Sequence, residues 1–181
     1  MTKRSLKHEI VDSIREIVFG LEDSLVSTLG AITGIAVGAG SQYIVILSGL
    51  VLIAAESMSM AAGSYLSSKN AAQAEAVFHN SKVSNEQTRP TRAAFVMGVF
   101  YFVGGFVPLA PYFFLDVRTA MLPSVIGTAI VLFLLGVWAA QYTKHSALRS
   151  GLEMTIVSLA AAGVGYLIGR AVASFFGVDV I

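Results

Sequence analysis

Long apolar runs separated by polar segments dominate this chain. The runs fall at about residues 24–40, 43–67, 93–115, 124–142 and 152–175, and a helix of about 20 apolar residues is long enough to cross a bilayer. Residues 5–20 instead show the helical period of an amphipathic helix, with Leu6, Ile10, Ile14 and Ile17 on one side. We therefore expect an all-α membrane protein with five transmembrane helices, in which the amphipathic helix continues into the first span.

The polar segments set the remaining divisions of a single transmembrane domain, 1–181. Residues 68–90 form the one long polar connection, which we interpret as a short cytosolic linker whose start could extend the second helix. A turn around Asp116, Arg118 and Pro123 is expected before the fourth span. Pro108 and Pro111, near the end of the third span, each free a carbonyl one turn earlier, which could kink the helix or coordinate a cation.

Composition supports the membrane assignment. Of the 181 residues, 55% are hydrophobic and only 13% are charged, with a mean hydropathy of +0.74, whereas soluble domains carry about 25% charged residues. The net charge of +1 and the sparse basic residues give no sign of a nucleic-acid partner; the expected surroundings are membrane lipid. Most basic residues flank the spans on one side, and the positive-inside rule then puts the N-terminus in the cytosol and the C-terminus outside or in a lumen.

Glu56 is the anomalous residue, because it lies in the middle of the second apolar run. A charge at that depth costs at least about 2.5 kcal/mol on insertion scales and usually faces a partner or a wet path. Met60, four residues later, shares its face of the helix, whereas Met58 points elsewhere. On the first helix, Asp12, Glu16 and Asp23 form one acidic stripe that climbs into the membrane.

Carboxylate and thioether ligands suit divalent transition metals, with the sulfur disfavouring Mg²⁺ and Ca²⁺. Carboxylates also carry protons, so an arriving cation would displace a proton. The alternative is that Glu56 is a hydrogen-bonded structural residue and the methionines only fill space. The chain has no cysteine and no G-x-x-x-x-G-K-[ST] loop, which excludes thiolate metal sites and gives no basis for ATP-driven pumping or enzymatic catalysis. No bound cofactor is expected.

Two ridges of small residues indicate close helix packing. The first span carries Gly30, Gly34 and Gly38, and the second carries Ala55, Ser59, Gly63 and Ser67. Small residues at four-residue spacing let the backbone of another helix approach closely. The ridges predict tight association but identify no substrate.

Several stretches resemble the vacuolar iron transporter family: EDSLVSTLGAITGIAVGAG, SMSMAAGSYLSSK, GGFVPLAPY and LFLLGVWAAQYTKHSALRSGLEM. The resemblance implies a homodimer that moves Fe²⁺, and often Mn²⁺, out of the cytosol in exchange for protons, along the first and second helices near the two-fold axis. It implies metal-binding roles for Asp23 in the membrane, Met60 on the second helix, and Asp12 and Glu16 at the cytosolic entrance.

The chain departs from the family pattern at three places. The usual Asp-Gly is Asp23-Ser24 here, the usual Gly-Glu-Tyr has Ser64 in its centre, and the second-helix glutamate falls at Leu52. We interpret Glu56, one turn after Leu52, as a compensating carboxylate and add it to the metal site. The linker is too short for the cytosolic metal-binding domain of many eukaryotic members, and we expect a bacterial or archaeal plasma membrane rather than a vacuolar one.

Two other functions stay open at this point. The cargo could be another cation or a small solute, given Leu52 and Ser64. The chain could also be a non-transporting membrane scaffold whose small-residue ridges are its functional surface.

Overall fold

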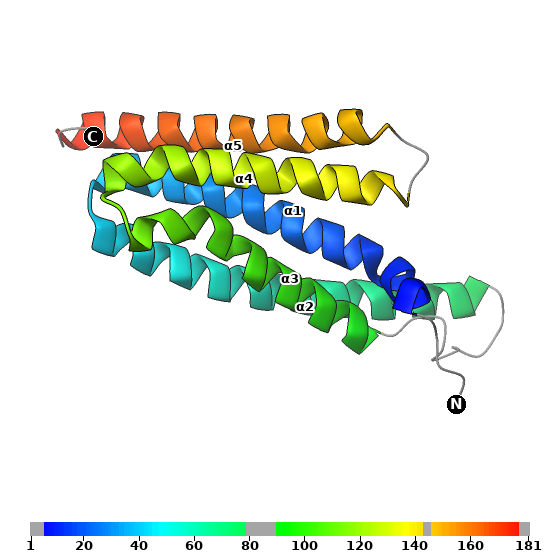
Figure 1. The fold of residues 1–181 in the computed structure, drawn as a ribbon. Coiled ribbons are helices and arrows are strands. Elements are labelled where there is room, and N and C mark those ends of the chain that lie inside the picture. The colour runs from blue at the N-terminus through cyan, green and yellow to red at the C-terminus, as the bar shows by residue number, and fades with distance from the viewer. Residues whose placement is uncertain (1–5, 79–89, 143–145, 178–181) are drawn as a thin grey trace.

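The computed structural model describes residues 6–78, 90–142 and 146–177, with side chains described from residue 13 onward except that of Glu75. This part of the chain consists of five α-helices and one short 3-10 helix (Figure 1). They are α1 (Leu6–Ala39), α2 (Gln42–Phe78), α3 (Pro90–Leu109), η1 (Ala110–Phe113), α4 (Val117–Ala140) and α5 (Ala147–Phe176). All five α-helices are long and apolar enough to cross a membrane, which confirms the predicted fold class.

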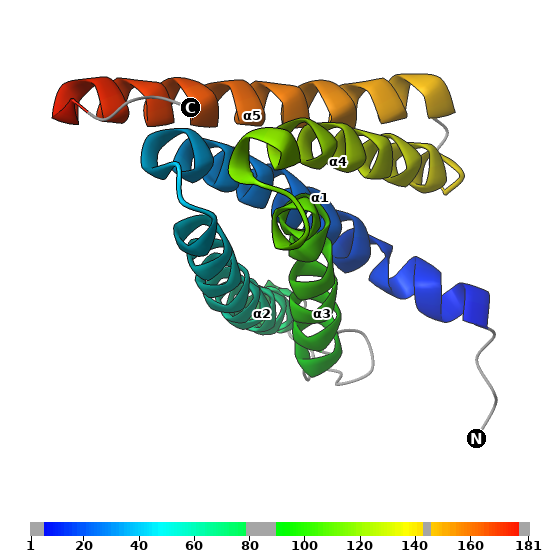
Figure 2. The ribbon, with the colours of Figure 1, turned by 60° about the vertical axis from the view of Figure 1, so that its left-hand side comes forward.

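α1 occupies the centre of the bundle. It packs mainly against α5 and α3, while α2 packs mainly against α3, and α4 against α5. Figure 2 shows α4 and α5 on one side of α1 and α2 and α3 on the other. Large apolar side chains such as Phe95, Leu122 and Leu167 stay exposed on the outside of the bundle. Such a surface suits lipid rather than water, because a soluble protein rarely exposes large contiguous apolar patches.

α1 is one continuous helix of 34 residues, so the amphipathic segment does run into the first span as predicted. α2 has 37 residues and includes the first eleven of the predicted linker, up to Phe78. At 1.5 Å per residue, a helix of this length measures roughly 55 Å, well beyond the hydrocarbon thickness of about 30 Å. One end of α2 therefore extends out of the membrane. Residues 79–89 of the linker lie outside the described part of the chain.

The glycine ridge of α1 is the contact surface for α5. A Cβ added to Gly34 would lie 2.9 Å from the carbonyl oxygen of Gly165, and one added to Gly30 would lie 3.1 Å from that of Ala161. The two backbones are thus in direct contact, which only small residues permit. The second ridge is different: Gly63 on α2 faces outward, and a Cβ there would meet nothing within 4 Å.

The two prolines at the end of α3 mark a change of helix type rather than a break. α3 passes through Pro108 and tightens into η1 after Leu109. In a 3-10 helix the Pro108 carbonyl would bond to the N–H of residue 111, which proline lacks. The Ser124 hydroxyl of α4 donates to that carbonyl instead, at 2.6 Å.

The predicted start of the fourth span at Ser124 is wrong. α4 begins at Val117, so Arg118 and Pro123 lie within the helix rather than in a turn before it. Pro123 is the seventh residue of α4. A proline there removes one backbone hydrogen bond near the helix end, which is a small loss compared with the apolar packing of the remaining turns. α5 likewise begins at Ala147, earlier than the predicted 152.

Candidate functional site

Two carboxylates, from different helices, are brought together inside the bundle. Asp23 on α1 and Glu56 on α2 are both partly buried within membrane-spanning segments, and their negative charges interact across the space between the helices. Like charges in a low-dielectric environment repel, so the pair is an unfavourable arrangement unless protons or a cation neutralise it.

Tyr101 is held to α1 at two points, Ser24 and Ser27, both within the helical turn that follows Asp23. The Ser24 hydroxyl donates to the Tyr101 backbone carbonyl at 2.5 Å, and the Ser27 and Tyr101 hydroxyls are hydrogen-bonded at 2.8 Å. The tyrosine side chain is completely buried. Gly104 leaves room for this arrangement, because a Cβ there would lie 3.2 Å from the Ser24 side chain. The contact between α1 and α3 therefore fixes the surroundings of Asp23.

The two central methionines of α2 point in different directions, as the helical period predicts. Met60 is partly buried and lies one turn beyond Glu56, whereas the side chain of Met58 is 74% exposed on the outside of the bundle. Only Met60 can therefore act together with Glu56.

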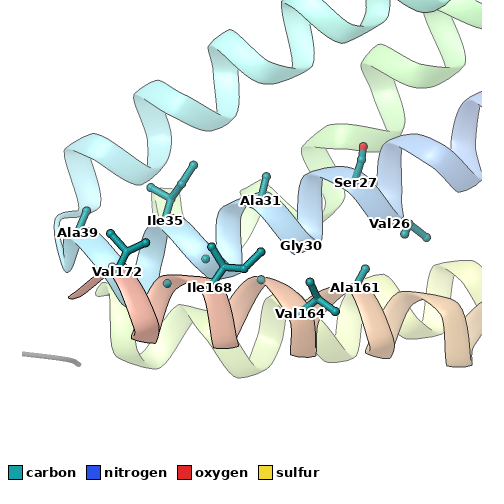
Figure 3. A pocket seen from close by; sticks show the side chains of 14 residues that line it. Val26, Ser27, Gly30, Ala31, Ile35, Ala39, Ala161, Val164, Ile168 and Val172 are labelled. Carbon is teal, nitrogen blue, oxygen red and sulfur yellow. The ribbon is translucent and has the colours of Figure 1, made fainter. Parts of the chain in front are cut away.

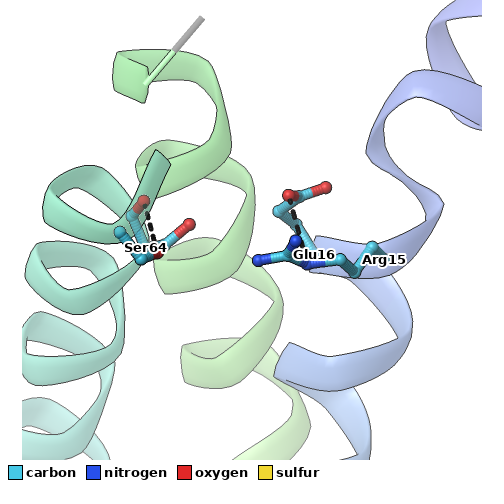
Figure 4. A network of polar contacts seen from close by, with 4 residues as sticks. Arg15, Glu16 and Ser64 are labelled. Atoms are coloured by element: carbon cyan, nitrogen blue, oxygen red, sulfur yellow. Dashed lines mark hydrogen bonds and ion pairs between the residues drawn. The ribbon is translucent and has the colours of Figure 1, made fainter. Parts of the chain in front are cut away.

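The remaining predicted site residues lie nearer the start of α1. Glu16 is 9% exposed, with Arg15 Nε 4.0 Å from its Oε1. Figure 4 shows this pair on α1. In the same view, the backbone carbonyl of Ser64 on α2 accepts a hydrogen bond from the Ser67 hydroxyl of the same helix. An ion pair with an exposed arginine at that distance contributes little to stability. Asp12 lies in α1 among the residues whose side chains fall outside the description.

The described residues of one chain do not present a closed set of metal ligands. Among the described residues, no three histidine, cysteine, aspartate or glutamate side chains gather closely enough to hold an ion. Asp23 and Glu56 supply two carboxylates, and Met60 lies one turn from Glu56 on α2. Transition metals bound through oxygen commonly take six ligands. Completing their coordination here needs water or ligands from elsewhere.

An open apolar groove of about 760 Å³ runs along the outside of the α1–α5 contact (Figure 3). Its floor is the glycine ridge of α1, and Val164, Ile168 and Val172 of α5 line its wall. Ser27, one turn after Asp23, is the one polar residue among those that line this groove. The groove and the carboxylate pair are thus neighbouring features of α1.

The sequence matches the model of the VIT family over residues 14–81 and 70–170, which together span most of the chain. The chain belongs to the VIT family. This confirms the resemblance to vacuolar iron transporters and the prediction that the VIT chain is not an enzyme.

Relatives of this VIT chain occur in archaea and plants. An uncharacterized protein of Methanocaldococcus jannaschii is 28% identical, covering 93% of this chain and 97% of its own length. Vacuolar iron transporter 1 of Eucalyptus grandis is 24% identical, covering 89% of this chain and 87% of its own. Vacuolar iron transporter 1 of Arabidopsis thaliana is also 24% identical, covering 88% and 86% respectively.

Sequence reasoning missed Ser27 and Tyr101 of this VIT chain. Ser27 follows Asp23 by four residues, so the helical period could have put it on the same face. Tyr101 gives no such signal, because it is one of several aromatic residues in a uniformly apolar span. Only the packing of α3 on α1 shows which of them bonds to Ser24 and Ser27.

Proposed function

We propose that the chain exports divalent transition metal, Fe²⁺ and in addition Mn²⁺, from the cytosol in exchange for protons. The observation that carries the proposal is that two carboxylates, Asp23 of α1 and Glu56 of α2, are partly buried within membrane-spanning segments of helices that contact each other. The names of the plant relatives, vacuolar iron transporter 1, support iron as the cargo. Met60 adds a soft sulfur ligand, which favours transition metals over Mg²⁺ and Ca²⁺.

Exchange follows from the charges of the site. Without metal, protons on Asp23 and Glu56 remove the repulsion between the two carboxylates. A divalent cation neutralises the same two charges and displaces the protons, because carboxylates bind metal in their deprotonated form. Metal and protons therefore occupy the site alternately, which is the requirement for moving them in opposite directions.

The proposed direction depends on the cytosolic N-terminus. The positive-inside bias puts the start of α1 at the cytosolic end, so Asp12 and Glu16 would form the entrance and attract cations toward Asp23. An archaeal relative of nearly the same length supports a prokaryotic plasma membrane as the location.

The proposed assembly is a homodimer. The described residues of one chain give an incomplete ligand set. The groove along α1 is open, and no described residue packs on Gly63 in the small-residue ridge of α2. A second copy seated against α1 and α2 would cover these surfaces and bring a second pair of carboxylates to the site. Light scattering of the purified protein should give a mass of two chains of 19.1 kDa after subtraction of detergent; a mass of one chain would contradict the dimer.

Flux measured in proteoliposomes tests the transport function. Fe²⁺ or Mn²⁺ should quench an internal metal-sensitive dye while a pH-sensitive dye reports protons moving the opposite way. Asp23→Ala and Met60→Ala should each lower the metal flux by about tenfold or more, as expected for loss of a ligand or its support. Met58→Ala is the matched control, since Met58 is on the same helix but 74% exposed on the outside, and it should leave the flux unchanged.

The same assay separates the alternatives. Normal flux in both Asp23→Ala and Met60→Ala would remove the proposed site. Transport of a different solute, with no response to Fe²⁺ or Mn²⁺, would indicate another cargo. A folded, reconstituted protein that moves nothing would favour the scaffold function.

A further inference from the structure

The side chain of Gln42 ties the start of α2 to the segment between η1 and α4. Its amide nitrogen, Nε2, donates to the Tyr112 carbonyl at 2.7 Å and forms a longer bond of 3.4 Å to the Leu115 carbonyl. Both partners are carbonyl oxygens, which only accept hydrogen bonds, so the amide nitrogen and not the amide oxygen must face them. One side chain thus joins the beginning of α2 to the end of η1.

The Tyr112 carbonyl depends on this bond because the local backbone turns away from it. In a continuing 3-10 helix this carbonyl would accept from the N–H of Leu115. That N–H instead bonds to the Pro111 carbonyl at 3.0 Å. Gln42 supplies the missing donor, and its loss would leave a part-buried carbonyl without that partner, which is unfavourable.

An apolar cluster fills the bundle beneath this contact. Its buried residues come from α1, α2, α3, η1 and α4, and we call it the η1 cluster; they include Ile32, Ala36, Val45, Ile53 and Tyr112. The cluster begins at the Gln42 contact, because Val45 follows Gln42 by three residues and Tyr112 offers the carbonyl that Gln42 binds. It extends toward the carboxylate pair, because Ile53 precedes Glu56 by three residues on α2.

The η1 cluster is packed tightly against the backbone of α2. A Cβ added to Gly49 would lie 2.6 Å from Leu109 Cδ1 and 3.3 Å from Ile32 Cδ1, so side chains of α3 and α1 touch the α2 backbone at this level. A charged ion cannot cross such apolar packing without a large desolvation cost. From the turn that joins them above the cluster, α1 and α2 diverge toward their other ends (Figure 2). The carboxylate pair is therefore closed off at the η1 end of the bundle.

We propose that Gln42 is the latch of a gate at the η1 end: its bonds to the Tyr112 and Leu115 carbonyls hold α2 against η1, and the η1 cluster parts when they break. The inference rests on the proposed function, because exchange requires the carboxylate pair to reach the two sides of the membrane in turn. A cation released at the η1 end must then pass the cluster. Neutral hydrogen bonds suit a latch, because each contributes little net stability and can break and re-form repeatedly.

Single introduced thiols test the gate, because the chain has no cysteine of its own. Ala36→Cys puts a thiol inside the η1 cluster, and Ala173→Cys puts one at a buried position of α5 outside the cluster. The purified full-length protein in lipid nanodiscs is treated with a water-soluble maleimide, which reaches both faces, so the result does not depend on membrane orientation. Because the cluster opens as a gate, the Ala36→Cys thiol should react faster than the Ala173→Cys thiol.

Gln42→Leu tests the latch, because leucine is of similar size but cannot donate a hydrogen bond. Loss of one or two neutral hydrogen bonds raises the open fraction, so the Ala36→Cys thiol should react about two- to tenfold faster. The rate at Ala173→Cys should stay unchanged, which guards against a general loosening of the bundle. Gln73→Leu is the matched control: Gln73 is exposed near the other end of the same helix, and this variant should change neither rate.

Three results would overturn the latch. They are equal rates at Ala36→Cys and Ala173→Cys when Gln42 is present, no acceleration at Ala36→Cys by Gln42→Leu, and the same acceleration at both thiols.

The thiol readout needs no transport, so its failure is separate from failure of the proposed function. Unchanged thiol rates in Gln42→Leu, together with metal flux that Asp23→Ala abolishes, remove only the latch. A protein that moves no metal, although Gln42→Leu speeds the reaction at Ala36→Cys, removes the proposed function and with it the role of the opening as a gate.

Discussion

The contact between the backbones of α1 and α5 yields a quantitative prediction, for Gly165→Ala. A Cβ at residue 165 would lie 2.8 Å from the Gly30 carbonyl carbon and would overlap its oxygen. Carbon atoms pack at about 3.5 Å or more, so α5 would have to move away from α1 by roughly 0.7 Å at least. Overpacking of this kind costs about 1–3 kcal/mol, against which alanine's higher helix propensity returns up to about 1 kcal/mol.

Gly163→Ala is the control for this substitution. Gly163 is on the same helix, faces outward, and a Cβ there would meet nothing within 4 Å. Gly163→Ala gains the same helix propensity as Gly165→Ala but creates no clash with α1. The two variants should therefore differ in unfolding free energy by about 1–3 kcal/mol. For a chain of this size each kcal/mol corresponds to about 2–4 °C in the midpoint of thermal unfolding.

Thermal unfolding in detergent, followed by the loss of the monodisperse peak in size-exclusion chromatography, measures this difference. Gly165→Ala should unfold several degrees below Gly163→Ala. If Gly165→Ala unfolded at the same temperature as Gly163→Ala or above it, the close approach of α1 and α5 would not exist, and the packing of the bundle around α1 would have to be revised.

Two further predictions concern the surroundings of Asp23. Ser24→Ala removes the hydrogen bond to the Tyr101 carbonyl and should lower the unfolding free energy by about 0.5–1.5 kcal/mol; an unchanged thermal midpoint would show that the bond contributes nothing. Glu56→Gln keeps the shape of the side chain but removes its charge and its exchangeable proton. We expect fewer protons to move per metal ion, measured as the ratio of the pH-dye and metal-dye signals, and an unchanged ratio would exclude Glu56 from the exchange.

The fold was largely predictable because its elements depend on local patterns. The apolar runs are long enough to predict five transmembrane helices. The four-residue spacing of Gly30, Gly34 and Gly38 predicted a close contact with another helix. The partner of that ridge could not be predicted, because a period identifies a face of one helix and not the helix it meets. The predicted starts of α4 and α5 were too late in the sequence, because prolines and polar residues are tolerated in the first turns of a helix.

The candidate site likewise contains residues that local sequence patterns predicted and residues that depend on packing between helices. The helical period put Glu56 and Met60 on one face of α2, and the structure keeps Met58 away from it. Tyr101 depends on the packing of α3 against α1, through Ser24 and Ser27, and no pattern within α3 distinguishes it from its aromatic neighbours. The metal-binding roles of Asp23, Met60, Glu56, Glu16 and Asp12 remain predictions for the flux measurements.

The uneven packing of α1 has a consequence for how an ion could leave the bundle. α1 is fixed to α5 by backbone contact and to α3 by the two serine bonds, while its contact with α2 is less extensive. A hinge between α1 and α2 would therefore disturb fewer contacts of α1 than a hinge between α1 and α3 or α5. Asp23 and Glu56 lie on opposite sides of that hinge, so a small rotation would change the distance between the two carboxylates and, under the proposed function, loosen the coordination of a cation held between them.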